Sequence, residues 1–235
     1  CNDLRGQPPF LLRYCRYPIK NNYRSDFEVR YGSQVLSCYP FGMMSLRQRN
    51  RQHAMRLTQR TALPMFMQRG FDEVTVGEIA AEVEMAASTV YRHFETKEAI
   101  VLWDEHDAAL DKALEDELSR RPPLAAMRDV FVEELGGRYD ADLDFQLQRV
   151  TYIYATEAVH AAAVHADLRD RDELSAGLDY FLSKANKAAA PLLAGAAMLA
   201  LDIAFDRWQQ LQASTPLGEL IAAEFDRLAH LDGIR

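Results

Sequence analysis

Apolar residues recur at helical spacing along most of the chain from about residue 49 onwards. Ile79, Ala80 and Val83 form one short apolar face, and Val90 and Phe94 form a second, one turn apart. This pattern predicts two short helices, joined by a turn at residues 84–86. No stretch shows a convincing strand pattern, so the chain is expected to be all-α.

The same periodicity predicts longer helices on both sides of this pair, over residues 49–69, 97–120, 124–135, 140–155, 157–185, 191–212 and 216–231. The first of them is expected to bend near Thr61, because Pro64 removes a backbone hydrogen bond. Gly136 and Gly137 are expected to end the helix that precedes them. The charged run 167–173 leaves open a break in the long helix that contains it.

Several helix ends carry residues that favour capping. Thr75 and Glu78 have the spacing of a capping box, in which each side chain bonds the other residue's backbone N–H. Gly70 fits the left-handed position after a helix. Thr96 is expected to cap the helix from residue 97, and Thr215 the last helix, with Pro216 in its first turn.

Two short helices joined by such a turn indicate a helix-turn-helix, whose second helix fits the major groove of DNA. The run TVGEIAAEVEMAASTVYRHFETKEAI (75–100), with its lead-in RGFDEVTV (69–76), resembles the DNA-binding motif of TetR-type transcriptional repressors over about fifty residues. The resemblance implies a helix-turn-helix head at 43–96 and a larger helical body for ligand binding and dimerisation at 97–235. The stretches LLAGAAMLALDIAFDRWQQL and LGELIAAEFDRL also resemble, weakly, the mycofactocin-regulator-like branch.

Two positions depart from the TetR-type pattern. Glu84 stands where a turn glycine is common, and a residue other than glycine is strained there if its φ is positive. Ala86 stands where a serine usually caps the second helix, so that cap is lost unless Ser88 or a backbone contact replaces it. Both departures are expected to affect DNA affinity more than the fold.

Side chains that donate hydrogen bonds lie mainly on the outer face of the second short helix. Arg92 and Ser88 are the candidates for base edges, since an arginine can bind guanine through two bonds. Hydroxyl, imidazole and ammonium groups favour phosphate oxygens, so we predict phosphate contacts by Arg49, Thr89, Tyr91, His93 and Lys97, and the resemblance adds Thr75. The alternative is that Tyr91 and His93 only pack the head.

Aromatic, methionine and polar residues of the body could line a pocket for a small, mostly apolar effector. The candidates are Trp103, His106, Met127, Phe131, Phe145, Tyr152, Thr156, His160, Phe181 and Phe205. The alternative for any one of them is an ordinary core position.

Alanine-rich faces near the C-terminus suggest a dimer of the four-helix type. The residues predicted for that interface are Leu193, Ala197, Leu201, Trp208, Leu220 and Phe225. The alternative is that both helices pack within one subunit.

The net charge of −8 conceals an asymmetry, because residues 1–56 carry a net +7 and the remainder −15. A basic end and an acidic body suit a protein that touches DNA at one end. Residues 1–42 hold scattered aromatic residues without periodicity, and we interpret them as an extension outside the working domain. The alternative is a basic arm that lies along DNA.

Other classes of function find little support in the sequence. Cys1, Cys15 and Cys38 match no zinc or redox spacing, which favours a reducing cytoplasm. There is no glycine-rich phosphate loop, no nucleophile elbow and no metal-ligand set around His160 and His165, so no enzyme, metal or cofactor is expected. The sequence contains no run of eighteen apolar residues, so no membrane-spanning helix is expected.

The sequence therefore predicts a cytoplasmic, homodimeric repressor that binds a palindromic DNA operator and is released by a small effector. Two alternatives remain open. One is a helical small-molecule binding protein whose head has lost DNA binding, and the other is an all-α enzyme.

Overall fold

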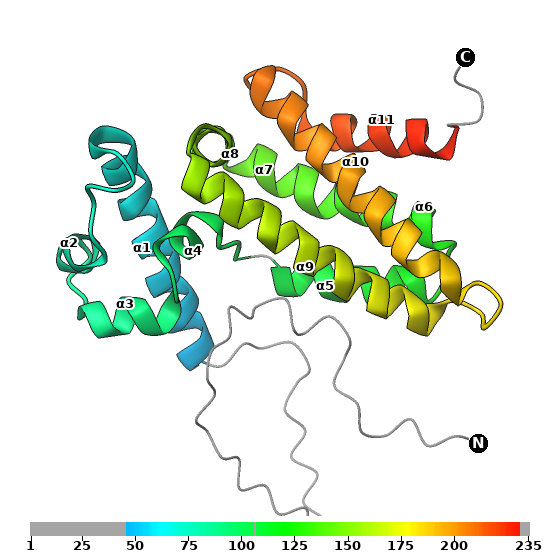
Figure 1. Cartoon of the computed structure of the whole chain (residues 1–235), viewed down its shortest axis with the longest axis horizontal. Coiled ribbons are helices and arrows are strands. Elements are labelled where there is room, and N and C mark those ends of the chain that lie inside the picture. The colour runs from blue at the N-terminus through cyan, green and yellow to red at the C-terminus, as the bar shows by residue number, and fades with distance from the viewer. Residues whose placement is uncertain (1–45, 106, 231–235) are drawn as a thin grey trace, which may run out of the picture. The chain divides into compact units, whose positions relative to one another are not determined.

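The computed structural model describes residues 46–105 and 107–230, and every regular element within them is a helix (Figure 1). The all-α prediction is confirmed for this part of the chain. The described residues divide into two units between Ile100 and Val101. We call residues 46–100 the head and residues 101–105 and 107–230 the body. The predicted extension 1–42 and His106 lie outside the described residues.

The head contains α1 (Leu46–Arg69), α2 (Val76–Glu82), α3 (Ala87–His93) and the start of α4 (Lys97–Leu102). Its core is fully buried and is formed by Leu63, Phe66, Val74, Ile79 and Val90. Helix α1 ends as predicted at Gly70, whose φ of 90° suits glycine and whose N–H donates to the carbonyl of Phe66 at 2.8 Å. Pro64 is accommodated within α1, and the bend expected near Thr61 stays a prediction.

The body contains α5 (Asp107–Leu118), α6 (Pro123–Val130), the π-helix η1 (Phe131–Gly136), α7 (Gly137–Ala141), α8 (Leu143–Ala155), α9 (Glu157–Phe181), the 3-10 turn η2 (Lys187–Ala189), α10 (Ala190–Gln210) and α11 (Leu217–Ala229). Helices α9 and α10 lie side by side, and α10 also packs on α11 (Figure 1). Trp208, Leu178, Met127 and Ile221 are fully buried at the centre of this packing.

The single helix predicted over residues 97–120 is wrong, because the structure has α4 and α5 with a break after Leu102. Arg149 of α8 is buried and explains the break. Its guanidinium donates to the carbonyl of Trp103 at 2.9 Å and to Asp104 at 3.2 Å. The Trp103 carbonyl thus serves the arginine at the point where a continuous helix would need it for its own ladder.

The prediction that Gly136 and Gly137 end a helix is also wrong. The chain passes through both in helical conformation, from α6 through η1 into α7. A Cβ added to Gly136 would lie 2.7 Å from the Cα of Gly218 on α11, whereas a Cβ on Gly137 would meet nothing within 4 Å. Gly136 therefore serves the close crossing of η1 and α11 rather than a helix end.

Two further expectations are settled within the body. Helix α9 runs unbroken through the charged residues 167–173. The cap predicted at Thr215 is wrong by one residue, since Pro216 is the N-cap of α11 and its carbonyl accepts from the N–H of Glu219 and Leu220. Assignment of helix ends commonly varies by this amount.

The residues predicted for the dimer interface pack within the single subunit, and their role in a dimer stays a prediction. Within the single subunit, Ala197, Leu201, Trp208, Leu220 and Phe225 are all less than a tenth exposed, and Leu193 packs partly buried against the same core. These side chains contribute to the packing of α10 and α11 in their own subunit. The apolar residues that α10 leaves exposed are Leu192, Leu199 and Ile203.

The span from Lys187 to Gln210 is long and apolar enough to cross a membrane by length and composition alone. Core helices of water-soluble proteins meet the same criterion. Only 33% of the apolar window of this span is buried, with Ala190, Ala194, Ala197 and Ala204 among the buried residues, and one such helix is weak evidence of a membrane span.

Candidate nucleic-acid interface

The start of α2 is fixed by the capping box that the sequence predicts. The Thr75 hydroxyl accepts from the N–H of Glu78 at 3.2 Å, and the Glu78 carboxylate accepts from the N–H of Thr75 at 2.8 Å. Arg69 donates to the other carboxylate oxygen at 2.6 Å. The bonds from the Thr75 backbone and from Arg69 lower the pKa of Glu78 to about 2. The acid thus stays ionised and holds the first turn of α2 in place.

The turn between α2 and α3 carries the strain expected at Glu84, whose φ is 54°. Glu84 N–H donates to Ala81 and Met85 N–H donates to Ala80, at 3.1 and 2.8 Å. Ala86 is the N-cap of α3 in extended conformation, and no side chain in the described head, Ser88 included, caps it. The positive φ expected at Glu84 and the missing cap expected at Ala86 are therefore both present, and the helix pair forms in spite of them.

Helix α3 has one buried and one open face. Val90 and the following Phe94 are almost completely buried, which orients the helix. Tyr91 is 53% exposed, and Ser88 and Arg92 are exposed as well. The predicted base-reading residues therefore share the solvent side of α3 with Tyr91, as a recognition helix requires.

His93 lies at the end of α3 and is only partly exposed. Burial lowers its pKa, and the charges of Arg51 and Arg92 lower it further. Its Nδ1 is buried and bonds to none of the described groups. The ring is therefore neutral near pH 7, and a contact with phosphate would come from a hydrogen bond rather than from a charge.

Lys97 forms a clasp inside the head that the sequence did not reveal. Its ammonium donates to the carbonyls of Phe71 at 2.5 Å and Val74 at 3.1 Å, and it lies 4.3 Å from the centre of the Phe71 ring. The predicted cap at Thr96 is confirmed by its 3.2 Å bond from the Ala99 N–H. Lys97 thus ties the first turn of α4 to the loop before α2, and its phosphate contact stays a prediction.

The remaining candidates of the head lie on its surface. Thr75 and Arg49 are exposed, and Thr89 is half-buried. The described part of the positive segment 1–56 contains the basic residues Arg47, Arg49, Arg51 and Arg56, all in the first half of α1.

The predicted effector-pocket residues are spread over several environments. Met127 and Phe131 are buried in the body core, and Phe181 and Phe205 pack against it. Trp103, Phe145, Tyr152 and Thr156 are partly buried, and His160 is exposed. Met127 and Phe131 fit the alternative of ordinary core positions, and the pocket as a whole stays a prediction.

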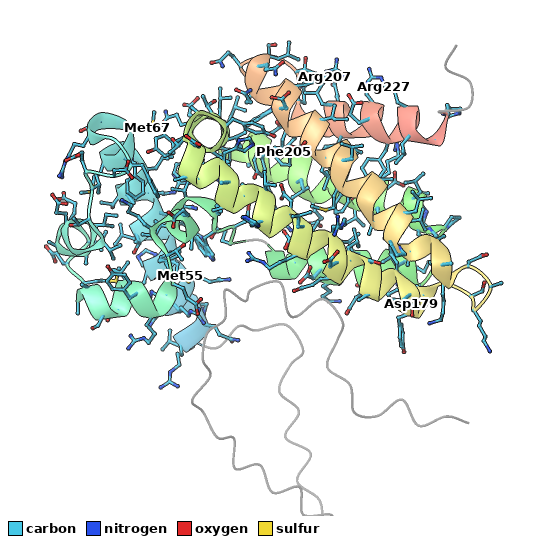
Figure 2. The ribbon with its side chains drawn as sticks, viewed as in Figure 1. Met55, Met67, Asp179, Phe205, Arg207 and Arg227 are labelled. Atoms are coloured by element: carbon cyan, nitrogen blue, oxygen red, sulfur yellow. The ribbon has the colours of Figure 1, made fainter. Side chains whose placement is uncertain are left out.

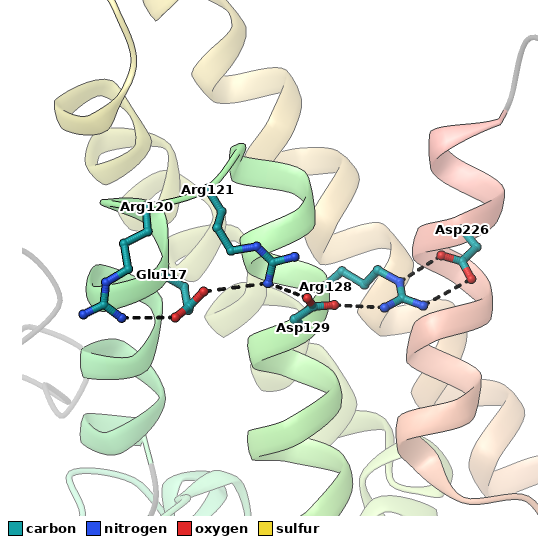
Figure 3. A network of polar contacts seen from close by, with 6 residues as sticks. All are labelled: Glu117, Arg120, Arg121, Arg128, Asp129 and Asp226. Carbon is teal, nitrogen blue, oxygen red and sulfur yellow. Dashed lines mark hydrogen bonds and ion pairs between the residues drawn. The ribbon is translucent and has the colours of Figure 1, made fainter.

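A cavity of about 470 Å³ opens beside α5, α6 and η1, but its lining is mostly charged, with Glu117, Arg121 and Asp129 among its walls. Figure 3 shows these groups in a line of ion pairs. Arg121 bonds Asp129 at 2.5 Å, and Arg128 bonds Asp129 at 2.9 Å and Asp226 of α11 at 2.8 Å. The side chains of these pairs are 31–59% exposed, so solvent screens the charges and each pair contributes little to stability.

Glu224 of α11 is more deeply placed. It is 8% exposed and accepts from Arg207 of α10 and from Arg227, whose positions Figure 2 shows near the α10–α11 turn and along α11. These two bonds outweigh burial and lower its pKa. The pairing fixes α11 to α10 within one subunit.

Comparison with known proteins identifies the head. Residues 60–102 match the family described as "Bacterial regulatory proteins, tetR family". A stretch of 103 residues is 36% identical to the HTH-type transcriptional regulator TcmR of Streptomyces glaucescens, over 42% of this chain and 45% of that protein. The chain thus spans about half the length of this curated relative. Together with the capping box, the turn and the open face of α3, these matches show that residues 60–102 carry the helix-turn-helix domain found in tetR-family regulators.

Proposed function

We propose that the protein is a transcriptional repressor that binds a near-palindromic DNA operator as a cytoplasmic homodimer. The observation that carries this proposal is the open face of α3, where Ser88, Tyr91 and Arg92 are exposed beside the buried anchor Val90. The match of residues 60–102 to the tetR family supports it. Two heads related by a two-fold axis would then read half-sites in successive major grooves.

The exposed apolar side chains of α10 support the dimer. Leu192 is 74% and Leu199 is 58% exposed, and Ile203 lies one turn further along. A second copy of the same helix would cover them in a two-fold contact. This surface differs from the residues that the sequence pattern suggested, which pack within the single subunit.

We further propose that a small, mostly apolar effector enters the body and releases the operator. Such release requires that the effector bind one spacing of the two heads more tightly than the other.

The test is binding of the purified protein to DNA from upstream of its own gene, at two salt concentrations, against random competitor. Tyr91→Phe is expected to weaken specific and random DNA alike, because a phosphate contact carries no sequence information. Arg92→Ala is expected to lose, in addition, about 1–3 kcal/mol of discrimination for its base pair. Equal loss on specific and random DNA would remove the assigned role of Arg92.

A second candidate is a helical binding protein whose head no longer reads DNA. The strained Glu84 and the uncapped Ala86 favour it. Binding that is weak, steeply salt-dependent and blind to sequence, in a genome-wide fragment selection as well, would support it.

A further inference from the structure

The sequence between α4 and α5 contains no residue that would end a helix by itself. Residues 97–118 include neither glycine nor proline, and most of them are alanine, leucine, glutamate or lysine. Residues of these types favour one continuous helix. The structure nevertheless ends α4 at Leu102 and begins α5 at Asp107. The break between the two helices therefore has its cause outside this segment.

Arg149 of α8 supplies that cause through its buried guanidinium. The side chain is 3% exposed, and it donates to the Trp103 carbonyl at 2.9 Å and to Asp104 at 3.2 Å. Two acceptors from the body hold it in this position, the Tyr139 hydroxyl at 2.7 Å and the Gln146 side-chain oxygen at 3.0 Å. A buried guanidinium that lost its carbonyl and carboxylate partners would be short of acceptors, so the bonds to the break are strongly favoured.

Two arrangements of the chain therefore compete for the same carbonyl. In the observed arrangement, the Trp103 carbonyl accepts from Arg149. In a continuous helix, the same carbonyl would accept from the N–H of residue 107, and α5 would have no N-terminus of its own. The local sequence favours the continuous helix, and the buried arginine favours the break. A small change on either side can shift the balance between two such arrangements.

We propose that the break between α4 and α5 is a conformational switch, which converts to one continuous helix when Arg149 releases Trp103 and Asp104. The break comes two residues after the boundary between head and body, which lies between Ile100 and Val101. Because α4 begins in the head, a change in how α4 continues reaches the head through a rigid element. This inference rests on the proposed function only in so far as the switch regulates DNA binding.

Hydrogen–deuterium exchange on the full chain without DNA tests the switch itself. The first four N–H groups of a separate helix have no intrahelical acceptor, whereas residues 107–110 would each gain one in a continuous helix. Arg149→Met replaces the donor by an unbranched apolar side chain, so exchange of amides 107–110 is expected to slow about tenfold. A role of Arg149 in stability alone predicts faster exchange there. Unchanged or faster exchange overturns the proposal.

Two further variants assign the effect to this contact. Asp104→Ala removes an acceptor within the break and leaves the buried arginine in place, so it is expected to slow the same amides even if Arg149→Met does not fold. Arg171→Met is the matched control, because it makes the same change at an exposed arginine of α9 that pairs with Asp172. Slower exchange of amides 107–110 in this control, or unchanged exchange in Asp104→Ala, overturns the proposal.

A substitution that disfavours the continuous helix gives a reversal that a purely structural role would not give. Glu105→Gly has this effect on a helix. Added to Arg149→Met, it is expected to restore the faster exchange of amides 107–110. Failure to restore it overturns the switch.

The same two substitutions test the regulation of DNA binding. The proposed repressor binds its operator without effector, so the form with the break is the binding form. Arg149→Met is expected to lower the affinity for DNA from upstream of the gene about tenfold, and added Glu105→Gly is expected to restore it. An affinity that stays unchanged, or is not restored, overturns the regulation. A wild-type chain that does not bind DNA would refute only the repressor function, because the exchange results do not depend on DNA.

Discussion

The crossing of η1 and α11 offers a sharp test of the packing. The adjacent glycines Gly136 and Gly137 differ in whether another backbone lies within contact distance. In Gly136→Ala the new Cβ would lie 2.7 Å from the Cα and 2.9 Å from the backbone N of Gly218. Both atoms belong to backbone, so no flexible side chain can move away. In Gly137→Ala the new Cβ meets nothing within 4 Å.

The two substitutions share the gain in helix propensity, which is about 0.5–1 kcal/mol in the middle of a helix. Gly137→Ala is expected to stabilise the protein by that amount. Gly136→Ala adds an overpacking cost of about 1–3 kcal/mol, and the rigid opposing backbone places it near the upper end. The shared gain cancels in the difference between the variants, which isolates a clash of about 3 kcal/mol.

Urea unfolding followed by circular dichroism measures this difference directly. In a thermal melt it corresponds to roughly 6–12 °C between the two variants, at about 2–4 °C per kcal/mol for a chain of this size. A difference below about 0.5 kcal/mol would refute the close crossing, since overpacking rarely costs so little. Gly218→Ala, whose Cβ would lie 3.2 Å from the Val132 carbonyl, is expected to fall between the two.

Four further predictions concern single residues. Glu84→Gly is expected to stabilise the head by about 1 kcal/mol in urea unfolding, because it relieves the positive φ, and a loss of stability would argue against the strain. Ala86→Ser is expected to raise the free energy of unfolding by about 0.5–2 kcal/mol, because serine supplies the missing cap of α3. DNA affinity measured alongside checks that the helix itself is unchanged. Glu78, with its pKa lowered to about 2, gives stability that is present above pH 4.5 and lost as the pH falls towards 2, so melting curves of Glu78→Gln should show a smaller loss over that range than the wild type. Asp111, with its pKa raised to about 8, gives stability that is full below pH 3.8 and lost as the pH rises through 8, so the melting temperature of Asp111→Asn should depend less on pH between 4 and 8.

The head could be predicted from the sequence because its determinants are local. The capping box at Thr75 and Glu78, the glycine at the end of α1 and the strained Glu84 each depend on a few consecutive residues. The clasp of Lys97 could not be predicted in the same way. Its carbonyl partners lie more than twenty residues away, and no pattern marks a carbonyl as an acceptor.

The errors in the body arise from tertiary contacts that override local signals. Arg149 interrupts a helix whose own sequence favours continuation. The backbone of Gly218 lies so close to Gly136 that a side chain at Gly136 would clash with it, which explains a glycine inside a helix. The alanine-rich α10 has small apolar residues on several faces, so periodicity could not tell its buried face from the exposed face that holds Leu199. No local pattern marks Asp111 as buried, because its burial depends on how α5 packs in the body.

The π-helix has a consequence for how the body can change. Residues 131–136 close their backbone rings through one residue more than an α-helix uses. Deletion of one residue there would restore an α-helix and rotate everything beyond it by about 100°. Tyr139 would then leave the rings of Phe205 and Trp208, which it now meets edge-on at 5.1 and 5.7 Å. The extra residue therefore fixes the rotation of α7 about the helix axis relative to α6. Substitutions within this turn are expected to be tolerated more readily than any change in its length.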